Sequence, residues 1–384
     1  MNAPPQNNSA PISLSIPLVF PFPILSLGSE QKSRFCLARG DTVLLSRDFG
    51  DLRFADNLLS YRAALEDICR KEQFIPRIIA HDLHPEYATT ILAPSLVESF
   101  HPPPSLKAVQ HHHAHLASVI ATRGIPGPVI GIVWDGSGYG EDGAIWGGEF
   151  LVGTTGSFNR AAHLEYIPLP GGEKAIEEPW RMAASYLYHF RGADFLDLAL
   201  PAVEAMNREE TALMLSMIDK GINSPVTSSM GRLFDAVSAL IGTGWINNSP
   251  AEAAIALEDA APAGGLGGDP YPFRLNRTGK TYIIELNQLF SVLISDISEG
   301  KGVEEMAFRF HATVIAIGSE VSGILAEETG LRDVVLIGGV FLNRIIRDGL
   351  AESLKSRGLN PILPKIISIG DESIAVGQAA VAAV

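Results

Sequence analysis

Residues 128–152 read PVIGIVWDGSGYGEDGAIWGGEFLV, and this stretch decides the fold. Apolar runs at 128–135 and 144–152 flank a segment that is rich in glycine, which is the pattern of two strands joined by a turn. Such a unit buries one face of a small sheet and needs helices to cover it. An α/β fold is therefore expected.

A comparable unit stands about a hundred residues earlier in the chain. Short apolar runs at 24–28, 34–38 and 42–46 predict three strands around polar turns, which would form a small antiparallel meander. Because a strand, a turn and another strand occur twice, the chain looks internally duplicated.

The segments around these two units alternate between helical and strand patterns. Apolar residues at helical spacing predict helices, and short apolar runs predict buried strands. Helices are expected at 56–73, 108–122 and 372–384 and from about Asn343, and strands at 77–80 and 334–340. Residues 173–310 are mostly helical in pattern, with a loop rich in glycine and proline at 261–272.

The length of the chain predicts two lobes. With 384 residues, of which 46% are hydrophobic, the chain exceeds a comfortable single core. We expect lobe I at 21–128, with the closing helix 372–384 packing on it, and lobe II at 129–371, with the helical insertion at 173–310.

The N-terminal 20 residues are expected to form an extended, partly disordered tail. The apolar stretch at 9–28 has no Lys or Arg before Lys32, as a signal peptide would require. Four prolines would also break a membrane-spanning helix, which needs about 20 apolar residues. These are Pro11, Pro17, Pro21 and Pro23.

Charge and cysteine content exclude several classes of function. The 29 basic and 43 acidic residues give a net charge of −14, which argues against a nucleic-acid partner. Cys36 and Cys69 are too few for a disulfide framework or a four-thiolate zinc site. The reducing cytoplasm is therefore the expected compartment, and any metal must be held by His and carboxylate side chains.

Four of the ten histidines lie in the run Val109-Gln110-His111-His112-His113-Ala114-His115. On a helix, His111 and His115 lie on one face about one turn apart, which suits the chelation of a single cation. The alternative is a run of solvated histidines, or of histidines that hydrogen-bond within the core. His112 and His113 point elsewhere and are expected to pack or hydrogen-bond.

Two aspartates are candidates to complete a metal site with His111 and His115. Asp135 stands at the end of a strand, and Asp371 precedes the last helix. Two imidazoles leave a divalent cation in need of anionic oxygen, so both carboxylates are predicted ligands. For Asp371 the alternative is a helix N-cap. Histidine and carboxylate ligands suit iron or zinc, and also manganese.

Three further segments are candidates for binding a nucleotide or phosphate, because glycine lets backbone amides approach a ligand closely. Ordinary turns and helix caps are the alternative for each. The candidate residues are Gly136, Ser137, Gly138 and Gly140 in the first segment, Gly231 and Asp235 within Thr227 to Asp235, and Gly338, Gly339 and Asn343.

Taken in order, these motifs resemble the C-terminal half of the HypF family, the carbamoyltransferases of nickel–iron hydrogenase maturation. The family is related to the threonylcarbamoyl-adenosine transferases of tRNA. The resemblance covers nearly everything after residue 20. Besides the segments above, the matching motifs are Leu27-Gly28 with Lys32, Phe35-Cys36-Leu37-Ala38, Asp82-Leu83-His84-Pro85, Leu169-Pro170-Gly171-Gly172, Glu178-Pro179-Trp180-Arg181 and Gly377-Gln378-Ala379.

The resemblance implies the two-lobed actin/Hsp70/sugar-kinase (ASKHA) architecture with duplicated RNase H-like lobes and a helical insertion. It also implies that Lys32, His84 and Arg181 are catalytic residues, that Gly28 contacts the cofactor and that Cys36 is not a nucleophile. The implied reaction uses carbamoyl phosphate and ATP to form carbamoyl adenylate, whose carbamoyl group passes to the C-terminal cysteine of HypE. The metal would act as a Lewis acid on phosphate or carbamoyl oxygen, while Lys32 and nearby amides stabilise phosphate charge.

The chain departs from the family pattern in three places. The family's acylphosphatase, zinc-finger and YrdC-like domains have no counterpart here. There are three alternative explanations: a separate domain or protein supplies the adenylate, the chain is a short form that acts alone, or the chain is an excised domain. An Asp-Gly-Gly before the last helix is Asp371-Glu372-Ser373. A Glu-Gly-Gln-Ala-Ala stretch is Pro250-Ala251-Glu252-Ala253-Ala254, which puts a nucleotide contact near residue 252 in doubt.

Two other functions fit the same residues. An O-carbamoyltransferase that acts on a small-molecule hydroxyl would share the fold, the histidines and carbamoyl adenylate. A non-catalytic ATP-binding scaffold for maturation partners would share the fold alone. A tRNA-modifying role is disfavoured because the acidic balance offers no phosphate track.

Overall fold

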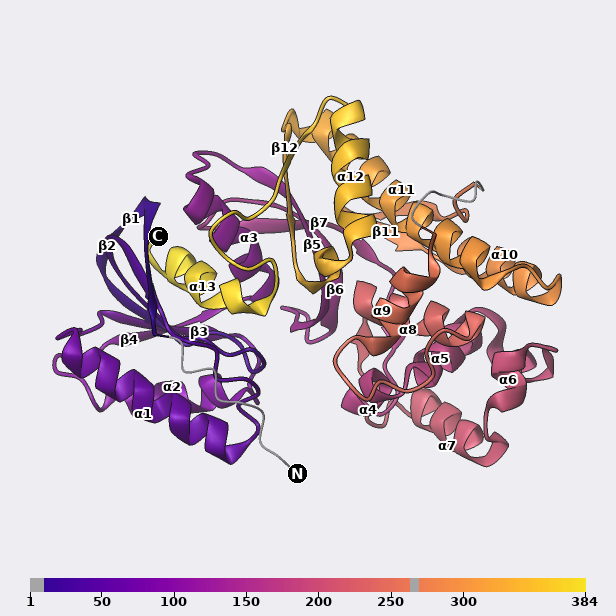
Figure 1. The fold of residues 1–384 in the computed structure, drawn as a ribbon, viewed down its shortest axis with the longest axis horizontal. Helices are drawn as coiled ribbons and strands as arrows, with labels where there is room; N and C mark the ends of the chain where they lie inside the picture. Colours follow the sequence, from indigo (N-terminus) through magenta and orange to yellow (C-terminus); the bar gives the residue numbers. More distant parts are fainter. Residues whose placement is uncertain (1–9, 263–268) are drawn as a thin grey trace.

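The computed structural model describes residues 10–262 and 269–384, and it contains two β-sheets with helices on both sides (Figure 1). The first sheet has the strand order β2-β1-β3-β4, and the main path of the second is β10-β11-β7-β6-β5-β12-β13. The first sheet lies at one end of the molecule with α1 and α2, and helices α4 to α9 gather at the other end. The expected two-lobed ASKHA fold is confirmed.

The first sheet is built from β1 (Ile12–Ser26), β2 (Cys36–Leu45), β3 (Ile78–Asp82) and β4 (Ser105–Val109). Strand β1 pairs antiparallel with β2 and parallel with β3, which pairs parallel with β4. Because side chains alternate along a strand, Leu25 and Ile79 face α1 (Ala55–Lys71) and α2 (Ala88–Val97). On the opposite face, Ile24 and Ala80 pack against α3 (His111–Arg123) and α13 (Ile374–Ala382).

The second sheet repeats this topology with more strands. Strand β5 (Val129–Tyr139) pairs antiparallel with β6 (Ile145–Gly153) and parallel with β12 (Asp333–Ile337). The remaining strands are β7 (Phe158–Leu164), β8 (Ile167–Pro168), β9 (Val226–Thr227), β10 (Arg274–Thr278), β11 (Thr281–Glu285) and β13 (Asn360–Ile362). An antiparallel strand pair thus recurs in both sheets, as the duplicated sequence pattern predicts, and in each sheet this pair is joined to parallel strands.

Most of the helices lie between β8 and β12. They are α4 (Glu173–Glu177), α5 (Pro179–Arg191), α6 (Pro201–Ala205), α7 (Arg208–Asp219), α8 (Met230–Ile241), α9 (Glu252–Ala260), α10 (Asn287–Ser298) and α11 (Val303–Thr329), with α12 (Arg344–Ser356) after β12. Part of the loop expected at 261–272 lies outside the described residues, which resume at 269. No helix among the described residues has the length and apolar character that crossing a membrane would need.

Helix α3 lies between the two lobes, and all its residues from His111 to Thr122 are buried. One side packs through Ala114, Ala117 and Ala121 with the first sheet and α13. The other side packs through Leu116, Val119 and Ile120 with strands of the second sheet. The histidine run at the start of this helix is therefore placed where the lobes meet.

The N-terminal region differs from the expected tail. Residues 1–9 lie outside the described residues, but β1 begins at Ile12 and pairs with β2, so 12–20 are strand. The pairing register shifts on both sides of Phe20, in the intervals that contain Pro17, Pro21 and Pro23. Because proline cannot donate to the sheet, these irregularities accommodate it, and the strand continues through the prolines.

The first lobe contains a two-strand ribbon of β1 and β2 where a three-strand meander was expected. Residues 36–45 form the single strand β2, and Gly40, with φ +62°, forms an irregularity opposite Phe20. The prediction treated 34–38 and 42–46 as two separate strands. The long β1 instead provides pairing partners on both sides of this point.

Candidate metal centre

The start of α3 is fixed by Gln110. Its side-chain carbonyl accepts a hydrogen bond from the backbone N–H of His113 at 2.8 Å, and thus caps the helix. Its amide nitrogen donates to the carbonyl of Tyr139 in β5 at 3.1 Å. The first helical turn, which holds the histidines, is therefore tied to the second lobe.

Four predicted ligands converge at the start of this helix. The Nε2 of His115 lies 3.2 Å from Asp135 Oδ2 and 3.6 Å from Asp371 Oδ1, and the Nε2 of His111 lies 3.5 Å from Asp135 Oδ2. One ligand atom from each of the four residues lies within 4.8 Å of the other three. The side chain of Asp371 is 26% exposed, so the cluster is open on that side.

This donor set fits a divalent cation. The Nε2 of His111 is buried without a hydrogen-bond partner among the described residues, although it faces Asp135. Two neutral imidazoles and two carboxylates balance the charge of a dication and suit zinc, iron or manganese. The N-cap alternative for Asp371 does not hold, because Gly370 and Ser373 occupy the cap positions.

Asp82 is a residue of this site that was not among the predicted ligands. Its Oδ2 lies 2.8 Å from His111 Nδ1, and the two side chains are 0% and 1% exposed. Its Oδ1 accepts the backbone N–H of His84 at 2.9 Å. A carboxylate on Nδ1 keeps the proton there and leaves the Nε2 lone pair facing the cluster. The signal in the sequence was a buried strand ending in a carboxylate.

The ionisation of the cluster follows from burial and from the opposite charges. Burial alone would raise the pKa of Asp135, but its close contacts with the imidazoles of His111 and His115 hold that pKa well below the usual value. Burial would lower the pKa of His111, and the charge of Asp82 raises it well above normal. The carboxylates therefore create a negative potential that favours positive charge at this point.

The other two histidines have contacts of their own. His112 Nδ1 lies 3.2 Å from the side-chain nitrogen of Gln110, and burial lowers the pKa of His112 to about 3. His113 Nε2 lies 2.9 Å from the carbonyl of Thr154. Both rings thus pack or hydrogen-bond away from the four-residue cluster.

The first glycine segment is a continuation of β5, and its pairing with β6 shifts register between Trp134 and Gly138. A Cβ on Gly138 would lie 2.5 Å from His112 Cε1 and 2.8 Å from His111 Cδ2, so only glycine permits this approach of α3. A Cβ on Gly140 would lie 2.1 Å from the indole nitrogen of Trp146. Ser137, between them, is partly exposed.

Backbone groups of the first and third segments meet at Asp135, and the second segment lies beside them. Its Oδ1 accepts the N–H of Gly136 at 2.8 Å and that of Gly339 at 3.2 Å. A Cβ on Gly231 would lie 3.0 Å from the Cα of Gly136. Gly338, with φ +111°, lies so close to β5 that a Cβ would be 2.2 Å from the Trp134 carbonyl oxygen. The metal centre and the predicted nucleotide segments are therefore contiguous.

Two side chains of these segments are engaged within the protein. Asn343 caps α12 by accepting the N–H of Ile346 at 3.0 Å. Asp235 accepts from Arg232 Nε at 2.7 Å, while its other oxygen is buried without a partner among the described residues. Burial raises the pKa of Asp235.

The residues predicted from the resemblance alone are spread more widely. Gly28 exchanges two hydrogen bonds with the side chain of Gln378, at 2.8 and 3.1 Å. Lys32 is exposed in the following loop, with φ +48°. The ring of His84 stacks on Tyr87, with centroids 4.2 Å apart.

Arg181 is held in the helical region. Its guanidinium donates to Glu178 at 2.5 Å and to Glu210 at 2.8 Å, and it lies over the ring of Trp180. These contacts do not bring it to the four-residue cluster.

The stretch that departs from the family pattern forms the start of α9. Ala251, with φ +60°, occupies the left-handed region that favours glycine. The carboxylate of Glu252 accepts the backbone N–H groups of Asn248 and Ser249, at 2.7 and 3.2 Å. Its charge is therefore used locally, in the turn that precedes the helix.

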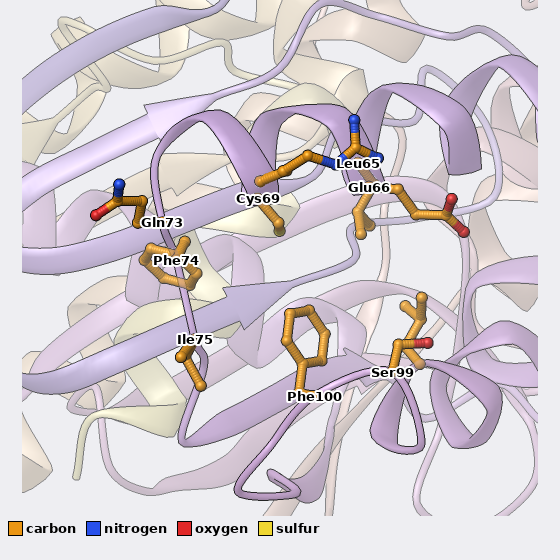
Figure 2. Close-up of a pocket in the computed structure, with 10 residues that line it drawn as sticks. Leu65, Glu66, Cys69, Gln73, Phe74, Ile75, Ser99 and Phe100 are labelled. Atoms are coloured by element: carbon orange, nitrogen blue, oxygen red, sulfur yellow. The ribbon is translucent and has the colours of Figure 1, made fainter.

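A cavity of about 540 Å³ lies in the first lobe, away from this centre (Figure 2). Leu65 and Cys69 of α1 line it together with Phe74 and Phe100, and polar side chains such as Glu66 also contribute to its lining. Burial raises the pKa of Cys69 to about 12, so the thiol is not poised for chemistry. None of the predicted site residues lines this cavity.

Comparison with known proteins identifies relatives along most of the chain. The family model described as the HypF Kae1-like domain matches residues 21–122, and the carbamoyltransferase Kae1-like domain, second subdomain, matches residues 131–378. Carbamoyltransferase HypF2 of Cupriavidus necator is 35% identical over 389 residues, covering 94% of this chain and 46% of that protein. The carbamoyltransferase HypF homolog of the same organism is also 35% identical, covering 94% of this chain and 91% of that protein.

A solved structure shares the fold. Full-length HypF in its phosphate- and nucleotide-bound form has a TM-score of 0.89 and 33% identity, covering 97% of this chain and 56% of that one. Fold and site thus define a two-lobed ASKHA-type protein with a buried histidine–aspartate centre. The chain belongs to the HypF carbamoyltransferase family. It spans about half the length of HypF2 and of the solved full-length HypF, and nearly all of the shorter homolog.

Proposed function

We propose that this chain transfers a carbamoyl group from carbamoyl adenylate to the C-terminal cysteine thiol of HypE, the step that leads to the cyanide ligand of nickel–iron hydrogenase. The observation that carries the proposal is the position of Asp135. One of its oxygens accepts the N–H groups of Gly136 and Gly339, and the other faces both predicted imidazole ligands. An acyl adenylate needs a nucleotide site that adjoins an electrophilic centre, and Asp135 joins the two.

His111, His115, Asp135 and Asp371 would hold one divalent cation, which supplies Lewis-acid polarisation of a carbamoyl or phosphate oxygen when bound. Asp82 orients His111 for this role, and the N–H groups of Gly136 and Gly339 fix the carboxylate of Asp135. We propose iron or zinc for this cation, with manganese as the other candidate.

The transfer itself is a substitution at the carbamoyl carbon. The thiolate sulfur forms a bond to that carbon, the bond from carbon to the phosphate oxygen breaks, and AMP leaves. Lys32 and backbone amides within 137–139 would stabilise the phosphate charge that develops on AMP, since the N–H groups of Gly136 and Gly140 donate to Asp135 and to the Ala144 carbonyl. Burial raises the pKa of Cys36 to about 12, so this buried thiol does not compete as an internal acceptor.

Carbamoyl adenylate would form from carbamoyl phosphate and ATP on a separate domain or protein. A reduced acceptor thiol makes the cytoplasm the proposed compartment, and Cys36 and Cys69 are both free in the structure. The net charge of −14 offers no track for nucleic acid, so none is proposed as a partner.

The direct test supplies carbamoyl adenylate, Zn²⁺ or Fe²⁺ and HypE, and follows the mass of HypE. We expect one carbamoyl group on HypE with the wild-type chain and none with the His111→Ala/His115→Ala variant. His163→Ala, which removes a buried histidine outside the cluster, is the matched control and should retain transfer. An unmodified HypE would refute the proposal, and carbamoylation of an added small-molecule hydroxyl would identify an O-carbamoyltransferase instead. Equal binding of HypE by all variants without turnover would indicate a scaffold.

A further inference from the structure

We propose that His311 is a positioning residue that sets the shape of the turn 338–343 and thereby the affinity for nucleotide. This inference rests on the part of the proposed function that places a nucleotide beside that turn. His311 lies in the long helix α11, is 0% exposed and belongs to none of the motifs singled out in the sequence. It acts through Asn343, which ends the turn and starts α12.

Both ring nitrogens of His311 are hydrogen-bonded. Nδ1 lies 2.8 Å from the carbonyl oxygen of Ala307, one turn earlier in the same helix. Nε2 lies 3.0 Å from the side-chain nitrogen of Asn343. The oxygen of the same Asn343 side chain accepts the backbone N–H of Ile346 at 3.0 Å.

These contacts determine one another. A carbonyl oxygen only accepts, so Nδ1 of His311 carries the hydrogen and Nε2 has a lone pair. The lone pair accepts from the NH₂ group of Asn343, which leaves the amide oxygen of Asn343 to face the N–H of Ile346. The orientation of the cap is thus set by the tautomer of a histidine on another helix. Burial lowers the pKa of His311 to about 4, so this neutral form persists near neutral pH.

His311 also connects the two predicted nucleotide segments. Its ring meets that of Phe234 on α8, with centroids 5.6 Å apart, and Phe234 adjoins Asp235. On its other side Asn343 closes the turn whose Gly339 N–H reaches Asp135 at 3.2 Å. Displacement of Asn343 would therefore shift the amides that adjoin Asp135 and the metal ligands. We infer that His311 holds the turn in register with α8.

The test measures binding of a non-hydrolysable ATP analogue by calorimetry. We expect about tenfold weaker binding for His311→Ala, which corresponds to the loss of one buried hydrogen bond. Asn343→Ala should weaken binding to a similar extent, and the double variant should bind no more weakly than either single variant. His163→Ala, a buried histidine with its own backbone contact, should bind within about twofold of the wild type.

A second variant covers the case in which His311→Ala does not fold. Asn343→Asp keeps a capping oxygen but removes the NH₂ donor, so His311 must carry a proton on Nε2 to keep the contact. The ¹⁵N spectrum of the imidazole should change from an unprotonated to a protonated Nε2. An unchanged spectrum, or additive losses in the double variant, would overturn the inference. A wild-type chain that binds no nucleotide would instead refute the proposed nucleotide site.

Discussion

Replacement of Asp82 by Asn should weaken metal binding while leaving the fold intact. Asp82 Oδ2 lies 2.8 Å from His111 Nδ1, and both side chains are almost fully buried. An asparagine can present an NH₂ group to Nδ1 only if the ring proton moves to Nε2, where it would block the ligand lone pair. It can also turn its oxygen toward Nδ1, but it then accepts without the charge that makes the imidazole a strong ligand.

The size of the effect follows from the lost interaction. Loss of a carboxylate partner behind a histidine ligand weakens metal affinity about 10- to 100-fold. This range corresponds to about 1.4–2.7 kcal/mol, which matches the worth of one hydrogen bond to a charged group, about 1.5–3 kcal/mol. The change should appear in Kd and leave one metal bound per chain.

The assay is calorimetric titration of the metal-free protein with Zn²⁺. Asp296→Asn is the matched control, because Asp296 is also a buried carboxylate but pairs with Lys301 and Arg309 in the helical region. We expect the control to lose stability and to keep its affinity for Zn²⁺. Equal affinities for wild type and Asp82→Asn would refute the role assigned to Asp82.

Three further predictions concern stability and reactivity. Ala251→Gly should raise the free energy of unfolding by about 1 kcal/mol, because φ is +60° at this position; urea denaturation at neutral pH would show an unchanged or lower midpoint if the strain is absent. Burial holds the pKa of His311 at about 4, against about 6.5 in the unfolded chain, so its contribution is complete above pH 6.5 and is lost as the pH falls toward 4. The wild type should thus lose about 2 kcal/mol more between pH 7 and 5 than His311→Gln in urea unfolding, and parallel losses would contradict this. Burial raises the pKa of Cys36 to about 12, so iodoacetamide should leave Cys36 unmodified in the native protein at pH 8 and label it in urea; rapid native labelling would contradict its assigned burial.

Much of the candidate site could be predicted from local patterns. The i, i+4 spacing of His111 and His115 is a property of one helix, and Asp135 directly follows the apolar run 128–134 within β5. Such features depend on residues close together in sequence. The sequence therefore indicated the strand pair β5–β6, the histidine helix and the four residues that the structure brings together.

What could not be predicted depends on contacts between distant segments. Asp82 contacts His111, and His311 contacts Asn343. Only tertiary packing brings the two residues of each pair within hydrogen-bonding distance. The prolines of β1 argued against a membrane-spanning helix and led to the expected tail, because no local pattern shows that β2 pairs with this segment. Arg181 matched a motif, but neighbouring carboxylates hold it in the helical region.

Metal content tests the central claim most directly. The chain should be purified without a chelator, reconstituted with Fe²⁺ or Zn²⁺, freed of loose ions and analysed by mass spectrometry of the elements. We predict about one metal per chain for the wild type and for His163→Ala, and none for His111→Ala/His115→Ala. A wild-type chain without metal, or a double variant that retains as much as the wild type, would contradict a metal centre on His111, His115, Asp135 and Asp371.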